Sequence, residues 1–237
     1  TLVYQHRICR INQLLNKRLG QISEGKEAWL KHCQRYGDGR IHGSVITNAC
    51  VSGRCSHRGP NVAQIPRVGQ PYGAECRALF HAPHGWRQVG SDASGLELRA
   101  LSSWLSYYDG GEYSKLVSME GFDIHTHNAK LFGIYDGQGT IEKRIREQAK
   151  TLIYAVLYGA GPMKLGTIVA PSLSERKQKE IGYETIDTFY KNLPAIKKLK
   201  DKVDEKVTQR GYLIGIDGRH LQRRSRHSAL NQLLQST

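Results

Sequence analysis

Apolar and polar residues recur with a helical period over much of the middle of the chain. Around RIREQAKTLIYAVLYGAG, apolar residues fall every three or four positions, and Gly159, Gly161 and Pro162 follow, which predicts a helix over 140–158 that ends there. LELRALSSWLSYY, from Leu96 to Tyr108, has the same spacing. Further helices are predicted at residues 1 to about 36, 113–119, 124–132, 174–191 and 194–209.

Other parts of the chain have the short, turn-separated pattern of strands. Residues 39–66 are rich in Gly, Ser, Asn and Pro and contain short β-branched pieces such as IHGSVIT. ALFHA (78–82) and WRQVGSDASG (86–95) are predicted as two more strands. The Asp217-Gly218 pair predicts a hairpin over 211–225, followed by the start of a helix. Strands, a helical insertion and strands again predict an α+β fold.

Charge adds a functional indication to this layout. Among 237 residues, 35 are Lys or Arg and 21 are Asp or Glu, a formal net charge of +14. Such a balance is typical of a protein that binds phosphate groups, most often nucleic acid, although a merely soluble basic protein has the same composition. The basic residues are spread along the chain, which favours a folded surface over a disordered tail.

No apolar run approaches the roughly 20 residues that a membrane span needs, and no leader sequence is visible. We therefore expect no membrane association. The five cysteines are odd in number and irregularly spaced, which favours a reduced, cytosolic setting. Cys50, Cys55 and His57 lie close together, but no second ligand pair follows at a usual distance. We expect these three residues to bind no metal.

Two sets of polar residues are candidates for chemistry. Arg146, Lys150, Tyr154 and Tyr158 are spaced by four, so on a helix they form one ribbon with two cations followed by two rings. Cations one turn apart can bind a polyphosphate and the rings can stack on a base, but an exposed basic turn beside core tyrosines fits the spacing too. Asp92 follows an apolar segment and precedes a helix, where it is either a hard-metal ligand or the N-cap.

Longer segments resemble one known family. DASGLELRALSSW (92–104) resembles the first catalytic motif of family-A DNA polymerases, the polymerase-I family. RIREQAKTLIYAVLYGAG (144–161) resembles its nucleotide-binding fingers helix, and VSGRCSHRGPNVAQIP (51–66), FDIHT (122–126) and HSALNQLLQS (227–236) are similar to further motifs in the same order. The resemblance covers about residues 18–237 and is greatest to the replicative polymerases of small-tailed lytic phages.

This resemblance implies a role for each matching residue. Asp92 and the carbonyl of Ala93 would bind catalytic Mg²⁺. The triphosphate would lie against His125, Arg146 and Lys150, with Arg146 and Lys150 acting in catalysis beside Asp92. Tyr154 would pack on the sugar and base of the incoming nucleotide and favour acceptance of sugars without a 3′-hydroxyl, and Glu97 would disfavour ribonucleotides. Contacts with primer–template DNA are implied for Arg54, Tyr158, Gly159, His227, Asn231 and Gln235.

The resemblance also implies a division of the chain. Residues 1–38 would lead from the thumb into the palm, 39–108 and 211–237 would belong to the palm, and 109–210 would form the fingers. The implied function is the template-directed addition of dNTPs to a primer in DNA replication, by two-metal nucleotidyl transfer. The implied location is the cytoplasm, which would be that of the host if a phage encodes the chain. A processivity factor or a complementary polymerase chain would be a further partner.

The chain departs from the family in one respect. The family supplies a second aspartate from a His-Asp-Glu motif on a later hairpin, and Thr237 comes before any such motif. We therefore expect a fragment, or one subunit of a split polymerase, that does not extend a primer alone. The alternative is a non-catalytic DNA-binding module. A P-loop hydrolase is excluded because the sequence contains no GxxxxGK[ST] motif.

Overall fold

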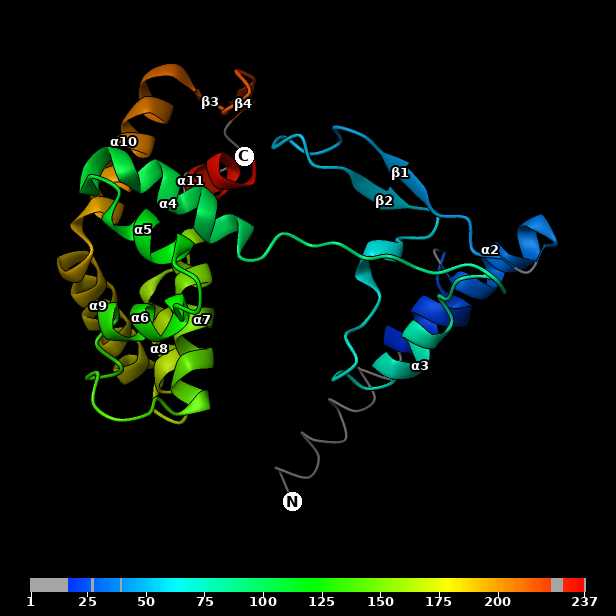
Figure 1. The fold of residues 1–237 in the computed structure, drawn as a ribbon, viewed down its shortest axis with the longest axis horizontal. Coiled ribbons are helices and arrows are strands. Elements are labelled where there is room, and N and C mark those ends of the chain that lie inside the picture. The colour runs from blue at the N-terminus through cyan, green and yellow to red at the C-terminus, as the bar shows by residue number, and fades with distance from the viewer. Residues whose placement is uncertain (1–16, 27, 39, 223–227, 237) are drawn as a thin grey trace. The chain divides into compact units, whose positions relative to one another are not determined.

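The structure is a computed structural model and describes residues 17–26, 28–38, 40–222 and 228–236 (Figure 1). The chain divides into two compact units, Thr1–Asp92 and Ala93–Thr237. Helices and two small antiparallel sheets make up these units, so the predicted α+β class is confirmed. The boundary between the units falls inside the segment 39–108 that we assign to the palm, and the palm and fingers assignment stays a prediction.

The first unit combines short helices with one hairpin. Residues 1–16 of the predicted N-terminal helix lie outside the described residues, and its described part is interrupted at Gly25, where the backbone is extended. β1 and β2 pair antiparallel, with Ser44 opposite Arg58, as the strand pattern of 39–66 predicts. The elements are η1 (Gly20–Glu24), α2 (Trp29–Tyr36), β1 (Ser44–Ile46), β2 (Ser56–Arg58), η2 (Val62–Gln64) and α3 (Gly73–Ala78).

One aromatic pair forms the centre of this unit. Trp29, the first residue of α2, is buried and meets Phe80 edge to face, with the ring centroids 5.2 Å apart. Ala28 and Cys76 are buried as well. Such a contact contributes stability beyond the apolar area it buries. It fixes α2 to the segment that follows α3, although these elements lie far apart in the sequence.

The prediction of two strands at 78–82 and 86–95 is wrong. Ala78 ends helix α3, and residues 79–95 contain no strand. A strand requires a neighbour that pairs its backbone N–H and C=O groups, and among the described residues the sheets pair only β1 with β2 and β3 with β4. The apolar pattern of these segments therefore could not specify strands without a pairing partner.

The second unit is a helical assembly with a C-terminal hairpin. All the helices predicted from periodicity between Leu96 and Arg210 are present, and α8 is an additional one. The elements are α4 (Leu96–Asp109), α5 (Glu112–Ser118), α6 (Ile124–Leu131), α7 (Lys143–Leu157), α8 (Pro162–Val169), α9 (Glu175–Asn192), α10 (Pro194–Arg210), β3 (Tyr212–Ile214), β4 (His220–Gln222) and α11 (Ala229–Gln235).

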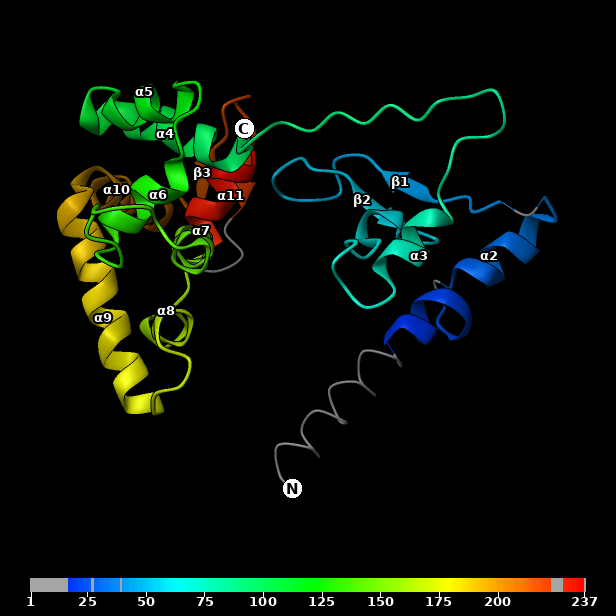
Figure 2. The ribbon, with the colours of Figure 1, turned by 60° about the horizontal axis from the view of Figure 1, so that its bottom comes forward.

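Residues 162–169 lie between two predicted helices and fold as the additional helix α8, which packs tightly on α9. Figure 2 shows the two helices side by side. A Cβ atom added at Gly166 would lie 1.6 Å from the carbonyl oxygen of Gln178, and one added at Gly182 would lie 1.8 Å from that of Pro162. Any larger residue would force the helices apart. Glycine thus permits this close approach of the two helices. Because glycine has a low helix propensity, the sequence pattern does not predict α8.

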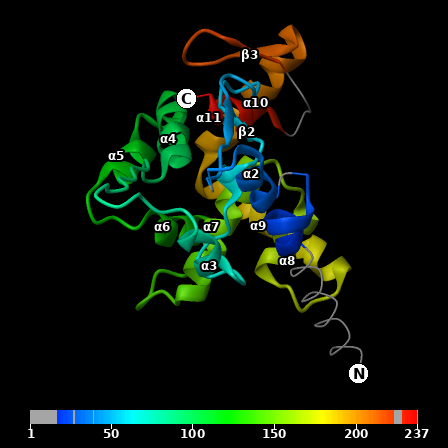
Figure 3. The same ribbon diagram turned by 90° about the vertical axis from the view of Figure 1, so that its right-hand side faces the viewer.

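Buried apolar residues join the remaining helices. Phe132, just after α6, stacks on Phe189 of α9 with the ring centroids 4.1 Å apart. Leu199, Val203 and Val207 form the buried side of α10. At the end of α10 the chain turns directly into the β3–β4 hairpin (Figure 3). Asp217 and Gly218 occupy the turn of this hairpin, as predicted. No described helix is both long and apolar enough to cross a membrane.

Candidate functional site

The polar ribbon of the long helix lies on α7 as the spacing predicts. Ala149, Leu152 and Val156 are buried on its apolar side. Along the other side, Arg146 is half-buried and Lys150 is exposed. Tyr154 is half-buried, and Tyr158 lies just past the last helical residue, with its backbone N–H still donating to Tyr154 at 2.9 Å. The ribbon therefore presents charge at one end and aromatic rings at the other.

A carboxylate holds the side chain of Arg146. The Nε and Nη2 atoms of Arg146 donate to Asp123 Oδ2 and Oδ1 at 2.7 and 3.0 Å. Partial burial alone would raise the pKa of Asp123, but hydrogen bonds from Arg146 and Thr126 outweigh it and bring the pKa to about 2. Asp123 is not among the site residues predicted from sequence. Its position before a helical pattern, where Asp is a preferred N-cap, was the available signal.

His125 lies beside the same cations. Burial lowers the pKa of His125, and the charges of Arg146 and Lys150 lower it further. The imidazole is therefore neutral at pH 7. Its Nδ1 atom is inaccessible and has no hydrogen-bond partner among the described residues. The three residues predicted to hold a triphosphate thus come together from α6 and α7, and two cations beside a neutral imidazole suit an anion.

A hydrogen bond links the aromatic end of the ribbon to α4. The hydroxyl of Tyr158 donates to Glu97 Oε1 at 3.0 Å. Burial raises the pKa of Tyr154, and the charge of Glu97 adds to this effect. Glu97, Tyr154 and Tyr158 therefore form a second cluster, which has one acidic side chain and no cation. The pattern of the sequence does not predict this bond between Glu97 and Tyr158, which lie 61 positions apart.

Asp92 does not cap the helix that follows it. The residue at the N-cap of α4 is Gly95, with φ of 61°, and no side chain caps this end. The alternative interpretation of Asp92 as an N-cap is therefore wrong. Asp92 and Ala93 are both exposed, and the boundary between the two units runs between them. The predicted approach of Asp92 to the cationic end of α7 stays a prediction.

The predicted DNA-contacting residues lie on separate elements. Arg54 is exposed in the turn between β1 and β2, and its carbonyl accepts from the Cys50 N–H at 3.1 Å. Asn231 and Gln235 lie one turn apart on α11, partly exposed. Gly159 follows α7 with φ of 74°, which a residue with a side chain rarely adopts. His227 lies outside the described residues.

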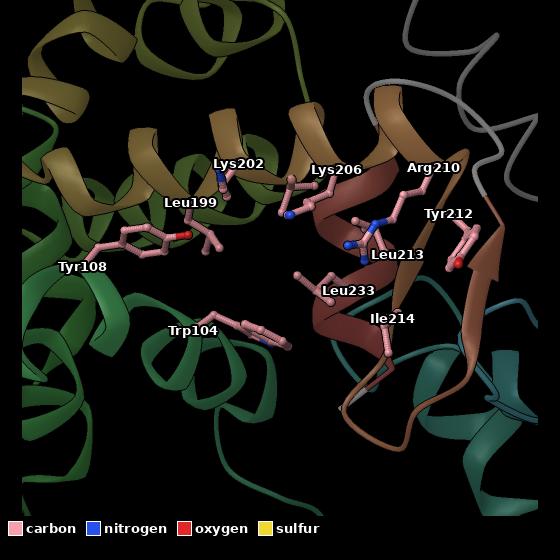
Figure 4. Close-up of a pocket in the computed structure, with 11 residues that line it drawn as sticks. Trp104, Tyr108, Leu199, Lys202, Lys206, Arg210, Tyr212, Leu213, Ile214 and Leu233 are labelled. Carbon is pink, nitrogen blue, oxygen red and sulfur yellow. The ribbon is translucent and has the colours of Figure 1, made fainter.

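Two further observations concern the described residues outside the predicted site. No group of three His, Cys, Asp or Glu residues that could hold a metal occurs within the described ranges. An apolar hollow of about 230 Å³ opens in the second unit between α4, α10, β3 and α11 (Figure 4). Trp104 and Tyr108 line one side, and Lys202, Lys206 and Arg210 line another.

Comparison with known proteins decides the family. Residues 10–237 match the model for "DNA polymerase family A". The chain belongs to this family. The DNA-directed DNA polymerases of Enterobacteria phage T3 and Escherichia phage T7 are each 41% identical to it over 94% of the chain and 32% of their own length. DNA polymerase I of Thermus aquaticus is 32% identical over 76% of the chain.

This family A polymerase chain also has a close structural neighbour. A structure titled "POL domain of Pol1 from M. smegmatis complex with DNA primer-template and dNTP" superimposes with a TM-score of 0.66 over 87% of this chain and 37% of that one. At 20% identity this likeness shows the fold alone. The family A chain spans about a third of the length of the phage relatives. The resemblance predicted from the motifs is confirmed.

Proposed function

We propose that this family A polymerase chain contributes palm and fingers to a template-directed DNA polymerase, which adds dNTPs to a primer 3′ end during replication. One observation supports this most directly: His125 of α6 lies beside Arg146 and Lys150 in the N-terminal half of α7, ahead of two tyrosines. Binding of DNA alone requires no such order of groups. The proposal also draws on family membership, since the phage relatives are named DNA-directed DNA polymerases.

The incoming nucleotide would lie along the α7 ribbon. Its triphosphate would contact Arg146, Lys150 and His125, because charge-assisted hydrogen bonds to phosphate are the strong ones. Tyr154 lies eight residues and about 12 Å along the helix from Arg146 and would pack on the sugar and base. Cations at the triphosphate would stabilise the charge that develops on the leaving pyrophosphate, so Arg146 and Lys150 would contribute to catalysis as well as to binding.

The second cluster would control which sugar and which template base fit. Glu97 would occupy the space beside the 2′ position and so exclude a ribonucleotide's hydroxyl. Its hydrogen bond with Tyr158 would fix both side chains, since each restrains the other's rotamer. Tyr158 and Gly159 would shape the pocket for the template base. Tyrosine at position 154 would favour acceptance of nucleotides that lack the 3′-hydroxyl.

Asp92 and Ala93, which lie shortly before α4, suit part of a magnesium site. Asp92 has an exposed carboxylate that caps no helix, and the Ala93 carbonyl is a second hard oxygen donor beside it. These two residues would hold Mg²⁺ together with oxygens of the bound triphosphate, because Mg²⁺ is usually held by one or two carboxylates plus substrate phosphates. Bound magnesium would activate the primer hydroxyl and stabilise the leaving oxygen.

Primer–template DNA would contact the separate basic and amide groups. Arg54, Asn231, Gln235 and His227 would meet the minor groove, whose acceptors are nearly the same for every base pair. A polymerase can therefore check pair geometry there without reading sequence. The net charge of +14 would supply phosphate contacts, so duplex binding should weaken steeply as salt rises. A processivity factor or a complementary polymerase chain is a further proposed partner.

Nucleotide binding tests the proposal against its alternative. Titration of the chain with Mg²⁺–dATP should show binding, and inorganic tripolyphosphate should compete with dATP. Lys150→Ala should weaken dATP binding while duplex DNA still binds. A non-catalytic DNA-binding module, the alternative, would bind duplex DNA without measurable affinity for dATP. If Lys150→Ala weakened duplex and nucleotide binding equally, that alternative would be favoured.

A further inference from the structure

One carboxylate connects the starts of the two helices that carry the proposed triphosphate site. Asp123 is the N-cap of α6, and its Oδ1 accepts from the backbone N–H of His125 at 3.2 Å. Its Oδ2 accepts from the hydroxyl of Thr126 at 2.6 Å. These local bonds fix the carboxylate to α6, so its direction is set before any other group reaches it.

The same two oxygens accept from Arg146, 23 positions along the chain. Each oxygen of Asp123 therefore receives one bond from α6 and one from the guanidinium. The positive charge of Arg146 offsets the negative charge of Asp123, to which it is paired. An anion approaching Arg146 would thus meet little repulsion from Asp123, and the carboxylate would not need to be displaced.

The pair leaves part of the guanidinium free for a ligand. Asp123 engages Nε and Nη2, which form one edge of the planar group. Nη1 contacts only Glu147 among the described residues, at 3.4 Å, the long limit for a hydrogen bond, and the Glu147 side chain is 54% exposed. Of the five N–H donors of an arginine, one on Nη1 and one on Nη2 therefore have no partner among the described residues, and the second on Nη1 makes only the long contact with Glu147.

We propose that Asp123 is a positioning residue for the triphosphate: it holds Arg146, whose charge acts on His125, by one edge so that the other edge is already directed when the nucleotide arrives. The proposal deepens the proposed function and rests on it. An arginine side chain that is ordered in advance loses less conformational freedom on binding. Asp123 would not touch the nucleotide itself, so its effect would pass entirely through Arg146.

A double-mutant cycle in the 237-residue chain tests this route. Asp123→Asn keeps a side chain that caps helices well but removes the charged, bidentate partner of Arg146. It should weaken Mg²⁺–dATP binding about five- to tenfold, the size expected when one well-placed charged contact is lost. In the Arg146→Ala background the same change should have less than about a twofold effect, since nothing is left for Asp123 to position.

Two further variants separate positioning from helix capping. Thr126→Val removes only the local bond to Asp123 and should leave nucleotide affinity within about twofold of the wild type. Asp123→Ser retains a good N-cap residue without a carboxylate and should reproduce the loss caused by Asp123→Asn. Inorganic tripolyphosphate should show the same ratios as dATP, because the positioned group serves the phosphate tail.

Each other result has a definite meaning. Tighter dATP binding by Asp123→Asn would identify Asp123 as a competitor for Arg146 and overturn the proposal. An equal loss in both backgrounds would assign Asp123 a purely structural role and overturn it too. If the wild-type chain bound neither dATP nor tripolyphosphate, the proposed function itself would fail, and this inference with it. Wild-type binding that Asp123→Asn leaves unchanged would overturn the inference alone.

Discussion

The two ends of α7 differ in how their side chains affect the stability of the fold. At its N-terminal end, the first turn contains Lys143, Arg144 and Arg146 and no acidic residue. Because the helix dipole is positive at this end, cations there reduce stability. At the C-terminal end, Tyr154 and Tyr158 bring no charge, and Tyr158 gains a hydrogen bond to Glu97. The cations at the N-terminal end thus lower the stability of the helix but suit an anionic ligand. The contacts at the C-terminal end stabilise the fold and suit an uncharged ligand.

This contrast shows why Asp123 matters to the cationic end. It supplies from α6 the negative charge that the first turn of α7 lacks. Stability and ligand binding are thereby separated: the carboxylate offsets one cation, while Lys150, exposed one turn later, has no ion-pair partner among the described residues. Lys150 is therefore the group whose loss should affect the ligand most and the fold least.

The largest effect is expected at Lys150. Replacing it with Ala should weaken Mg²⁺–dATP binding roughly 10- to 100-fold, the range for loss of a hydrogen bond to a charged group, measured by calorimetric titration. Duplex affinity should change less than about threefold, because many other cations share that contact. Lys197→Ala, at an exposed lysine of α10, is the matched control and should leave dATP affinity unchanged. A similar loss in both variants would show a general charge effect.

At the aromatic end, Glu97 should affect discrimination rather than affinity. Glu97→Gln keeps the size of the side chain but weakens its hold on the Tyr158 hydroxyl. We expect the ratio of dATP to ATP affinity to fall about fivefold, the equivalent of roughly 1 kcal/mol. Glu112→Gln, on the exposed start of α5, should leave the ratio unchanged. If dATP affinity fell as sharply as the ratio, Glu97 would belong with the cationic end instead.

A smaller effect separates the two tyrosines. Tyr158→Phe removes the hydrogen bond to Glu97 and should lower the free energy of unfolding by about 0.5–1 kcal/mol, measured by urea denaturation. Tyr154→Phe is its natural control, because no hydrogen bond joins the Tyr154 hydroxyl to a described residue. That change should stay within about 0.5 kcal/mol. Equal losses in the two variants would mean that the Glu97 bond contributes no stability.

The sequence was sufficient for this ribbon and insufficient for its partners. Spacing by four placed Arg146 through Tyr158 on one face of a helix, because helical geometry is local. Asp123 was missed as a partner of Arg146, since the pair joins residues 23 positions apart through tertiary packing. The Tyr158–Glu97 bond spans 61 positions and was hidden for the same reason. Spacing reveals a face but not what packs against it.

Failures in the fold have the same origin. The apolar segment at 86–95 resembled a strand, but strand formation depends on a pairing neighbour that local pattern does not specify. Helix α8 was missed because Gly166 weakens the helical signal, while its value lies in the close approach to Gln178 of α9. By contrast, the turn at Asp217 and Gly218 was predictable, because the chemistry that specifies it is contained in the turn itself.

The smallest expected effect concerns pH at the cationic end. Burial lowers the pKa of His125, and of His127 for the same reason, so the unfolded chain takes up protons more readily than the folded one. Stability is therefore complete above the ordinary histidine pKa of about 6.5 and declines as pH falls below it. Asp123, with a pKa of about 2, stays ionised throughout this window and keeps its pair with Arg146.

Urea midpoints at pH 7.5 and 5.5 measure this decline, which we expect to be below about 1 kcal/mol for each partly exposed histidine. His125→Gln should reduce the difference between the two pH values, and adding His127→Gln should reduce it further. Tyr158→Phe alters neither histidine, so it should shift both midpoints equally. A pH difference that His125→Gln leaves intact would mean that the cationic end is not responsible for the decline.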